Sequence, residues 1–298
     1  MIRLNPDNTG NMLTQLTQVK SQEDDALLQL SSGRRVNKPS DDPAASATMV
    51  SVRARSSADD QYLQNISTVR ATLSTADSTL NSVVLALQHG LSIAVEGANG
   101  TQSPSGRSAM ADDIEGVRDQ ILSLANTSFA GNFLFAGTAT NTKPFVADAT
   151  SPSGFAYAGN TNRNSVQIGE NRSLDMNTPG DQIFSAPGAD AFAALTNLIQ
   201  SLRSNDTGAI ETATGDLRAA LDHVTAARVP YGNTLAQLDN DESFLRSDQL
   251  QMTTKENGLI SSDPLAAISA LRNAQFAREA TLSAFGQTSN LSLLDYLK

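Results

Sequence analysis

Apolar residues recur at alternating spacings of four and three along one stretch of the chain, at Tyr62, Ile66, Val69, Leu73, Ala76, Leu80, Val83 and Leu87. This heptad spacing places one apolar stripe on a helix and is typical of helices that pack together at shallow angles. The register continues backwards with more polar residues. We therefore predict a helix over residues 43–94, about 75 Å long at 1.5 Å per residue.

The same period returns in later stretches, at 110–124, 192–202, 210–224 and 235–259. Only 5% of the residues are aromatic and Trp is absent, so a thick core is disfavoured. The sequence predicts a mainly α fold, an elongated coiled-coil-like helical bundle that forms a rod, with a small β-rich inserted domain. Pro230 interrupts the last stretch and predicts a kink or a break there, because proline removes a backbone donor and clashes with the preceding turn.

Residues 138–187 have a different composition, rich in Gly, Asn, Thr, Ser and Pro. Short alternations at Phe155/Tyr157 and Val166/Ile168 favour strands, with turns at Asn141–Pro144, Gly159–Asn160 and Pro179–Gly180. The alternative is a long irregular loop.

The two ends carry weaker helical patterns. The N-terminal one contains Leu16, Val19, Ala26 and Leu30, and a small-residue seam runs from Ala267 to Thr288 beside bulkier residues. Asp263 has the properties of an N-cap and Pro264 those of a first helical residue. Because alanines bury little area each, these helices need a partner to be stable.

Three parts are expected on this basis. Terminal helices at 1–42 and 262–298 form an assembly region, residues 43–137 and 188–261 form the helical rod, and 138–187 form the β-rich domain.

Charge and composition restrict the function classes. The net charge of -10 disfavours nucleic acid and anionic membranes as partners. The chain lacks Cys, has no secretory signal pattern, and carries only two histidines, His89 and His223, so we expect no catalytic residues, no metal and no cofactor. The stretch from Asp239 begins like a calcium loop, but Phe244 stands where glycine is needed.

The stretch LSSGRRVNKPSDDPAAS, residues 30–46, stops one helix and starts the next. Gly33 suits a left-handed helix end, Pro43 a first helical position and Asp42 its N-cap. Capping does not require the three cations Arg34, Arg35 and Lys38. They are either a solvated turn or a contact surface for acidic groups on an adjacent subunit, with Asp41 and Asp42 orienting the turn.

These residues carry a resemblance. LSSGRRVN followed by Asp41-Asp42 resembles the N-terminal signature of the flagellin superfamily, and the proline-bracketed PSDDP is similar to that of its hook-filament junction proteins. GNFLFAGTATNTKPF from Gly131, NTPGDQIF from Asn177 and NLSLLDYLK from Asn290 agree. Pro230 departs from the pattern, which has a continuous helix at this point.

The resemblance implies a structural adaptor that forms a ring, with its terminal helices in an inner layer and its central parts outside. The implied partners are a junction protein on the hook side, flagellin on the filament side, further copies of itself, and a cytosolic export chaperone at the C-terminal helix. Export through the flagellar type III apparatus, without a cleaved signal peptide, would place it in the extracellular flagellum. The residues expected to mediate assembly are Leu16, Val19, Leu30, Gly33, Arg34, Arg35, Asn37, Lys38, Asp41, Asp42, Ile268, Leu271, Leu282, Phe285, Leu291, Leu294, Tyr296 and Leu297.

Two alternatives stay open at this point. The chain could be a filament flagellin, a structural subunit, although PSDDP and the final LLDYLK argue against it. A more distant alternative is an unrelated helical enzyme or a cytosolic coiled-coil scaffold.

Overall fold

The computed structural model describes the backbone of residues 6–296 and the side chains of residues 10–287. Two compact units divide the chain: unit 1 comprises Met1–Ala58 and Ser247–Lys298, and unit 2 comprises Asp59–Arg246. Two long helices, α2 (Pro43–Gly97) and α6 (Thr207–Ile260), contribute residues to both units. The three-part division expected from composition differs from these units and stays a prediction.

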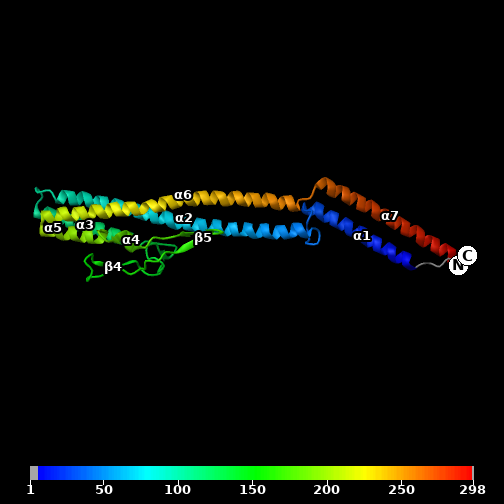
Figure 1. The fold of residues 1–298 in the computed structure, drawn as a ribbon, viewed down its shortest axis with the longest axis horizontal. Coiled ribbons are helices and arrows are strands. Elements are labelled where there is room, and N and C mark those ends of the chain that lie inside the picture. The colour runs from blue at the N-terminus through cyan, green and yellow to red at the C-terminus, as the bar shows by residue number, and fades with distance from the viewer. Residues whose placement is uncertain (1–5, 297–298) are drawn as a thin grey trace. The chain divides into compact units, whose positions relative to one another are not determined.

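Unit 2 is a helical bundle, as the heptad period predicts. The part of α2 from Asp59 onward runs alongside α3 (Pro104–Ala125), α5 (Ala191–Ser204) and the part of α6 up to Arg246 (Figure 1). The predicted stripe on α2 is the side that faces this core, since Ile66, Leu80 and Leu87 are fully buried. The mainly α fold with coiled-coil-like helical packing is therefore confirmed.

Polar residues fix the ends of these helices. Ser103 accepts a hydrogen bond from the backbone N–H of Gly106 and is followed by proline at the first position of α3. Arg107, only 3% exposed, donates from Nε to the Gly97 carbonyl and from Nη2 to the Asn99 carbonyl. A buried cation thereby satisfies carbonyl groups at the end of α2, where the helix dipole favours positive charge.

Helix α6 is continuous through Pro230, so the predicted break is wrong. A proline inside a helix costs about 3 kcal/mol, but the neighbouring turns are held by tertiary contacts. Val224 and Leu238 are fully buried and Tyr231 is 3% exposed. Arg228 donates to both carboxylate oxygens of Asp77 on α2, at 3.0 and 3.2 Å. Packing on both sides of the proline outweighs the lost backbone hydrogen bond.

The β-rich part consists of short antiparallel hairpins, each a separate two-stranded sheet. The region 138–187 holds two complete hairpins, which confirms the expected β-rich character, but the first hairpin lies before it. The predicted turn at Pro179–Gly180 is wrong: a short helix, α4 (Gly180–Phe184), begins there, and a Cβ on Gly180 would lie 2.9 Å from the Phe145 ring and 3.0 Å from the Phe135 carbonyl oxygen. The strands pair as β1 (Ser128–Phe129) with β2 (Asn132–Phe133), β3 (Phe145–Ala147) with β4 (Phe155–Tyr157), β5 (Ser165–Gly169) with β6 (Arg172–Asp175), and β7 (Ser185–Ala186) with β8 (Ala189–Asp190).

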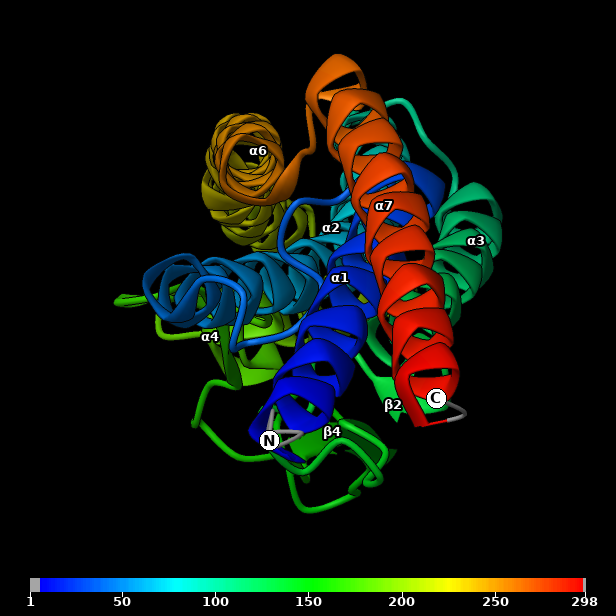
Figure 2. The ribbon, with the colours of Figure 1, turned by 90° about the vertical axis from the view of Figure 1, so that its right-hand side faces the viewer.

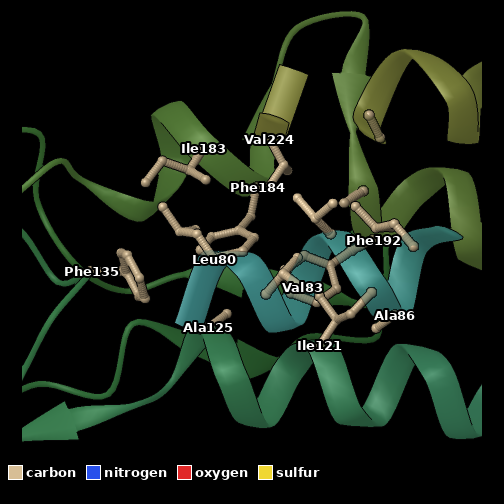
Figure 3. Close-up of a cluster of buried hydrophobic side chains, with 14 of the residues drawn as sticks. Leu80, Val83, Ala86, Ile121, Ala125, Phe135, Ile183, Phe184, Phe192 and Val224 are labelled. Carbon is tan, nitrogen blue, oxygen red and sulfur yellow. The ribbon is translucent and has the colours of Figure 1, made fainter. Parts of the chain in front are cut away.

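The hairpin region joins the helices through a cluster of aromatic rings. The ring of Phe145 is tilted by 50° against Phe192 at 5.1 Å and meets Phe184 edge-on at 5.6 Å, and Phe135 meets Phe184 edge-on at 5.4 Å. Figure 3 shows Phe135, Phe184 and Phe192 beside Leu80 and Val83 of α2 and Ile121 of α3. The few aromatic residues of this chain are thus concentrated where the β-rich part needs a core.

Unit 1 contains the two terminal helices, α1 (Pro6–Ser32) and α7 (Pro264–Tyr296), which lie side by side and run antiparallel (Figures 1 and 2). Among the described side chains of this pair, the buried ones are small: Ala26, Ala267 and Ala274 are 5%, 2% and 5% exposed. An ion pair between Arg278 of α7 and Glu23 of α1, with a 2.9 Å separation, crosses the same contact.

By length and composition, α2 is also apolar enough to cross a membrane. Half of the apolar window is buried within the protein. A core helix passes the same test, so this property is weak evidence for a membrane span.

Candidate assembly site

The polar stretch between α1 and α2 has the caps that its sequence predicts. Gly33 has φ of +67° at the end of α1, a left-handed conformation that favours glycine. Asp42 accepts hydrogen bonds from Ala45 N–H at its side chain and from Ser46 N–H at its carbonyl, and Pro43 is the first residue of α2. Asp263 caps α7 in the same manner by accepting from Leu265 N–H at 2.9 Å.

This stretch pairs with the connection between α6 and α7, which lies far away in the sequence. Arg35 N–H donates to the Ile260 carbonyl at 2.6 Å, and Ser262 N–H donates to the Gly33 carbonyl at 3.0 Å. Arg34 and Ser261 form an antiparallel bridge. We call this pairing of residues 33–42 with residues 259–262 the clasp, and it ties the two interhelical connections of unit 1 together through backbone hydrogen bonds.

Arg35 closes the clasp with its side chain. Its Nη2 donates both to Asp42 Oδ2 and to the Leu259 carbonyl, each at 3.0 Å. One guanidinium group therefore joins the N-cap carboxylate of α2 to a carbonyl in the last turn of α6, where a cation is favoured by the helix dipole. Its predicted contact with a neighbouring subunit stays a prediction, but this side chain already has partners within the chain.

Asp41 organises the turn itself. Its Oδ2 accepts from the N–H groups of Asn37 and Lys38 at 2.9 and 2.8 Å. These backbone hydrogen bonds, first that from Lys38, lower the pKa of Asp41 below its ordinary value. Hydrogen bonding from Ala45 N–H and then from Arg35 lowers the pKa of Asp42 in the same direction. Both carboxylates stay charged at neutral pH and hold the backbone of the turn.

A small apolar cluster lies beneath the clasp. Val36 is 4% exposed, Ala45 6% and Ile260 2%, with Met49 and Leu259 packed against them. Val36 and Ile260 were not among the residues predicted to mediate assembly. A single valine inside a polar stretch is a signal for a buried anchor, but its partner, more than 200 residues away, has no local signature.

The other two cations of the stretch face solvent. Lys38 lies 3.6 Å from Asp25 of α1, with both side chains at least half exposed, so that pair contributes little. Within the part of the chain that the structure describes, the guanidinium of Arg34 has no ion pair, and the residue is exposed. Arg34 is thus the cation of this stretch that is most available to another molecule.

The expected assembly residues on the terminal helices divide by exposure. Leu16, Val19 and Leu271 are half-buried in the pair, whereas Leu30, Ile268, Leu282 and Phe285 are 39–47% exposed. Leu291, Leu294 and Tyr296 lie in α7, but their side chains, and the whole of Leu297, fall outside the described residues.

Further ion pairs of unit 1, which the sequence does not predict, join α2 to α6. Arg53 binds Glu256 at 2.7 Å and Arg55 binds Asp248 at 2.9 Å. Arg55 and Glu256 occupy seam positions where the heptad pattern turns polar. Cross-helix ion pairs replace apolar contacts at those positions and fix the register of the two helices.

His223 is engaged with the Gln182 carbonyl at 2.8 Å. Within the described residues, no group of three or more His, Asp or Glu side chains lies close enough to hold a metal ion.

Comparisons with known proteins agree with this architecture. Residues 7–140 match the family described as the bacterial flagellin N-terminal helical region. The chain is 30% identical to flagellar hook-associated protein 3 of Escherichia coli, with 91% of each chain covered. The chain belongs to the flagellar hook-associated protein 3 family. The Salmonella typhimurium protein of the same name is 28% identical over 89% of this chain and 90% of its own length.

Solved structures extend the agreement to the fold. A flagellar hook-associated protein from Vibrio parahaemolyticus, 25% identical, superposes with a TM-score of 0.68 and covers 74% of this chain and 100% of that one. The present chain, as a member of the hook-associated protein 3 family, therefore has a structural role in the bacterial flagellum.

Proposed function

We propose that this protein is the adaptor that joins the hook side of the flagellum to its filament, assembling as a ring through its terminal helices. The observation that carries the proposal is the similarity to hook-associated protein 3 over about nine-tenths of both chains. The exposed apolar side chains of α1 and α7 support it, since Leu13, Leu27, Phe276 and Leu282 are 47–74% exposed within the part of the chain that the structure describes.

The partners follow from the same proposal. A junction protein binds on the hook side, flagellin binds on the filament side, and neighbouring copies complete the ring. A cytosolic chaperone protects the C-terminal helix before export, and the chain reaches the outside of the cell without a cleaved signal peptide. Residues 1–42 and 262–298 form the inner assembly layer, and 138–187 face outward.

Deletion of the gene tests the proposal. Cells that lack it should bear hooks without filaments while releasing flagellin into the medium, as seen by electron microscopy and by assay of the medium. Reintroduction of the gene should restore filaments. If deletion leaves no flagellin at all, the chain is itself the filament subunit, and if filaments are normal, the adaptor proposal is wrong.

The role of Arg34 can be tested separately. Arg34→Glu should weaken junction assembly, because its guanidinium is exposed in the clasp and faces solvent in the single chain. Arg218→Glu, which changes an exposed arginine on α6 in unit 2, is the matched control and should assemble normally. If both variants assemble equally well, Arg34 makes no contact that assembly needs, and the cations of the stretch belong to a solvated turn.

A further inference from the structure

The chain contains two Asn-Gly dipeptides, Asn99-Gly100 and Asn257-Gly258. An asparagine loses its side-chain amide most easily before glycine, because glycine has no Cβ to hinder the approach of its backbone nitrogen to the amide carbon. All four residues are exposed to solvent. The two dipeptides therefore share composition and exposure, and they differ in the conformation of their backbone.

Asn99-Gly100 lies in the connection between α2 and α3. Within the part of the chain that the structure describes, the Gly100 N–H has no hydrogen-bond acceptor. By contrast, Gly258 lies inside α6, where each backbone N–H donates to the carbonyl four residues earlier. The nitrogen that must react therefore lacks a helical hydrogen bond at Gly100 and has one at Gly258.

Hydrogen-bond donors surround both oxygen atoms of Asn99. The side-chain oxygen Oδ1 accepts from the N–H and from the hydroxyl of Thr101, at 3.1 and 3.0 Å. The backbone oxygen accepts from the N–H of Gln102 at 3.1 Å and from Nη2 of Arg107 at 3.0 Å. Arg107 is only 3% exposed and its Nε and Nη1 have partners of their own, so the guanidinium is held in place.

These donors lie where negative charge develops during deamidation. The Gly100 nitrogen first gives its proton to hydroxide, and the resulting anion is shared with the Asn99 backbone oxygen, beside the guanidinium of Arg107. The nitrogen then bonds to the side-chain carbon Cγ, and the charge moves to Oδ1, where Thr101 donates. Ammonia leaves with a proton from water as the bond from Cγ to the amide nitrogen breaks, and a cyclic imide remains. Fixed donors at both oxygens lower the barrier to this reaction.

Water then opens the imide at one of its two carbonyl carbons. Attack at the side-chain carbon gives aspartate. Attack at the backbone carbon gives isoaspartate, in which the main chain runs through the side chain and the former backbone carbonyl becomes a carboxylate. Arg107 Nη2 lies 3.0 Å from the oxygen of that backbone carbonyl. A guanidinium at this distance stabilises the new carboxylate through a charge-assisted hydrogen bond and so favours isoaspartate.

We infer that Asn99 is a site of spontaneous deamidation in the folded protein, with isoaspartate held by Arg107 as the main product. Asn257 reacts far more slowly, because its dipeptide is held within a helix. The reaction lengthens the main chain between α2 and α3 by a methylene group and adds a negative charge beside the cation that binds the end of α2. The inference does not depend on the adaptor function.

Ageing of the purified full-length protein tests the inference. Folded protein and protein unfolded in guanidinium chloride are incubated at physiological temperature and pH, and peptide mapping by mass spectrometry measures deamidation at both asparagines. In the folded protein Asn257 should react at least about tenfold more slowly than Asn99, since a tenfold difference needs only about 1.4 kcal/mol of helix opening. In the unfolded protein the two should react at similar rates.

The product is measured on the same samples. An isoaspartyl methyltransferase labels isoaspartate but not aspartate, and the isoaspartate fraction at Asn99 should be higher in the folded than in the unfolded protein. Gly100→Ala should largely abolish deamidation at Asn99. A Cβ at Gly100 meets nothing within 4 Å, so this variant should keep the fold, which circular dichroism checks. Gly258→Ala is the matched control and should leave the rate at Asn99 unchanged.

Equal rates at Asn99 and Asn257 in the folded protein would overturn the inference. An isoaspartate fraction that is the same in the folded and unfolded protein would overturn it too, because Arg107 would then have no influence on the product. A native rate at Asn99 in Gly100→Ala would mean that the amide is lost without attack by the backbone nitrogen, which also contradicts the inference.

Discussion

Unit 2 and the α1/α7 pair are built on similar helical periods but differ in what they bury. In unit 2 the seam buries large side chains, such as Leu80 and Ile114 at 0% exposed. Between residues 10–32 of α1 and 264–287 of α7 the buried residues are alanines, and leucines such as Leu27 remain 55% exposed. Since burial contributes about 25 cal/mol per Å² of apolar surface, residue size and not period decides whether a helix pair is stable alone.

Truncation of one leucine in each region tests this difference in burial, and it should produce the largest effect. Leu80→Ala should lower the free energy of unfolding by about 2–5 kcal/mol, because it leaves a cavity in a packed core. Leu27→Ala should change it by less than about 0.5 kcal/mol in the single chain, because that side chain is largely in water. Urea unfolding followed by circular dichroism measures both. Similar losses from the two variants would mean that the pair is as well packed as the bundle.

Two glycines with positive φ provide a second contrast. A Cβ at Gly137 in unit 2 would lie 2.0 Å from the Asn160 carbonyl oxygen, whereas a Cβ at Gly33 in the clasp meets nothing within 4 Å. Gly33→Ala should therefore cost only the left-handed conformation, about 1–2 kcal/mol. Gly137→Ala should cost more and disturb the hairpin region. Equal thermal shifts for the two alanine variants would contradict this account of the two turns.

A smaller effect should appear in acid. The pKa values of Asp41 and Asp42 are lowered in the folded protein from 3.8, mainly by backbone N–H donors. A lowered pKa stabilises the fold above the unfolded value, so the clasp should be fully stable above about pH 5 and loosen as the pH falls through and below 3.8.

Amide exchange at Asn37, Lys38 and Ala45 as a function of pH reports this loosening. Asp42→Asn retains a capping side chain but removes the charge. It should abolish the acid dependence at Ala45 and leave that at Asn37 and Lys38. Unchanged protection of all three amides at pH 2 in the native protein would show that the carboxylates do not hold the turn.

The same contrast explains how much of the structure could be predicted. Periodicity located the long helices and the buried face of α2, since period and burial are coupled by helix geometry. The caps at Gly33, Asp42 and Asp263 were also predictable, because capping is local. The clasp was not, since Arg35 and Ile260 meet only through the path of the chain. The break considered at Pro230 was wrong for the same reason: the local cost of the proline is offset by contacts from other helices, and a kink there stays a prediction.

The sequence predicted which residues belong to the candidate site, but it did not predict which partners each of them has. The stretch from Gly33 to Asp42 was singled out by its charge, and the structure gives those residues different partners. Arg35 is bound within the chain, whereas Arg34 faces solvent, and nothing in two adjacent arginines distinguishes them beforehand. Which leucines of α1 and α7 remain exposed was equally hidden, because that depends on how closely the alanines bring the two helices together.

The central claim is that the α1/α7 pair is completed by neighbouring copies, and hydrogen exchange tests it most directly. In dilute monomer, amides from Leu13 to Leu30 should exchange far faster than those from Ile66 to Leu87, and they should become protected in assembled junctions. Protection in the monomer equal to that of the unit 2 core would contradict the claim, because the pair would then need no neighbour.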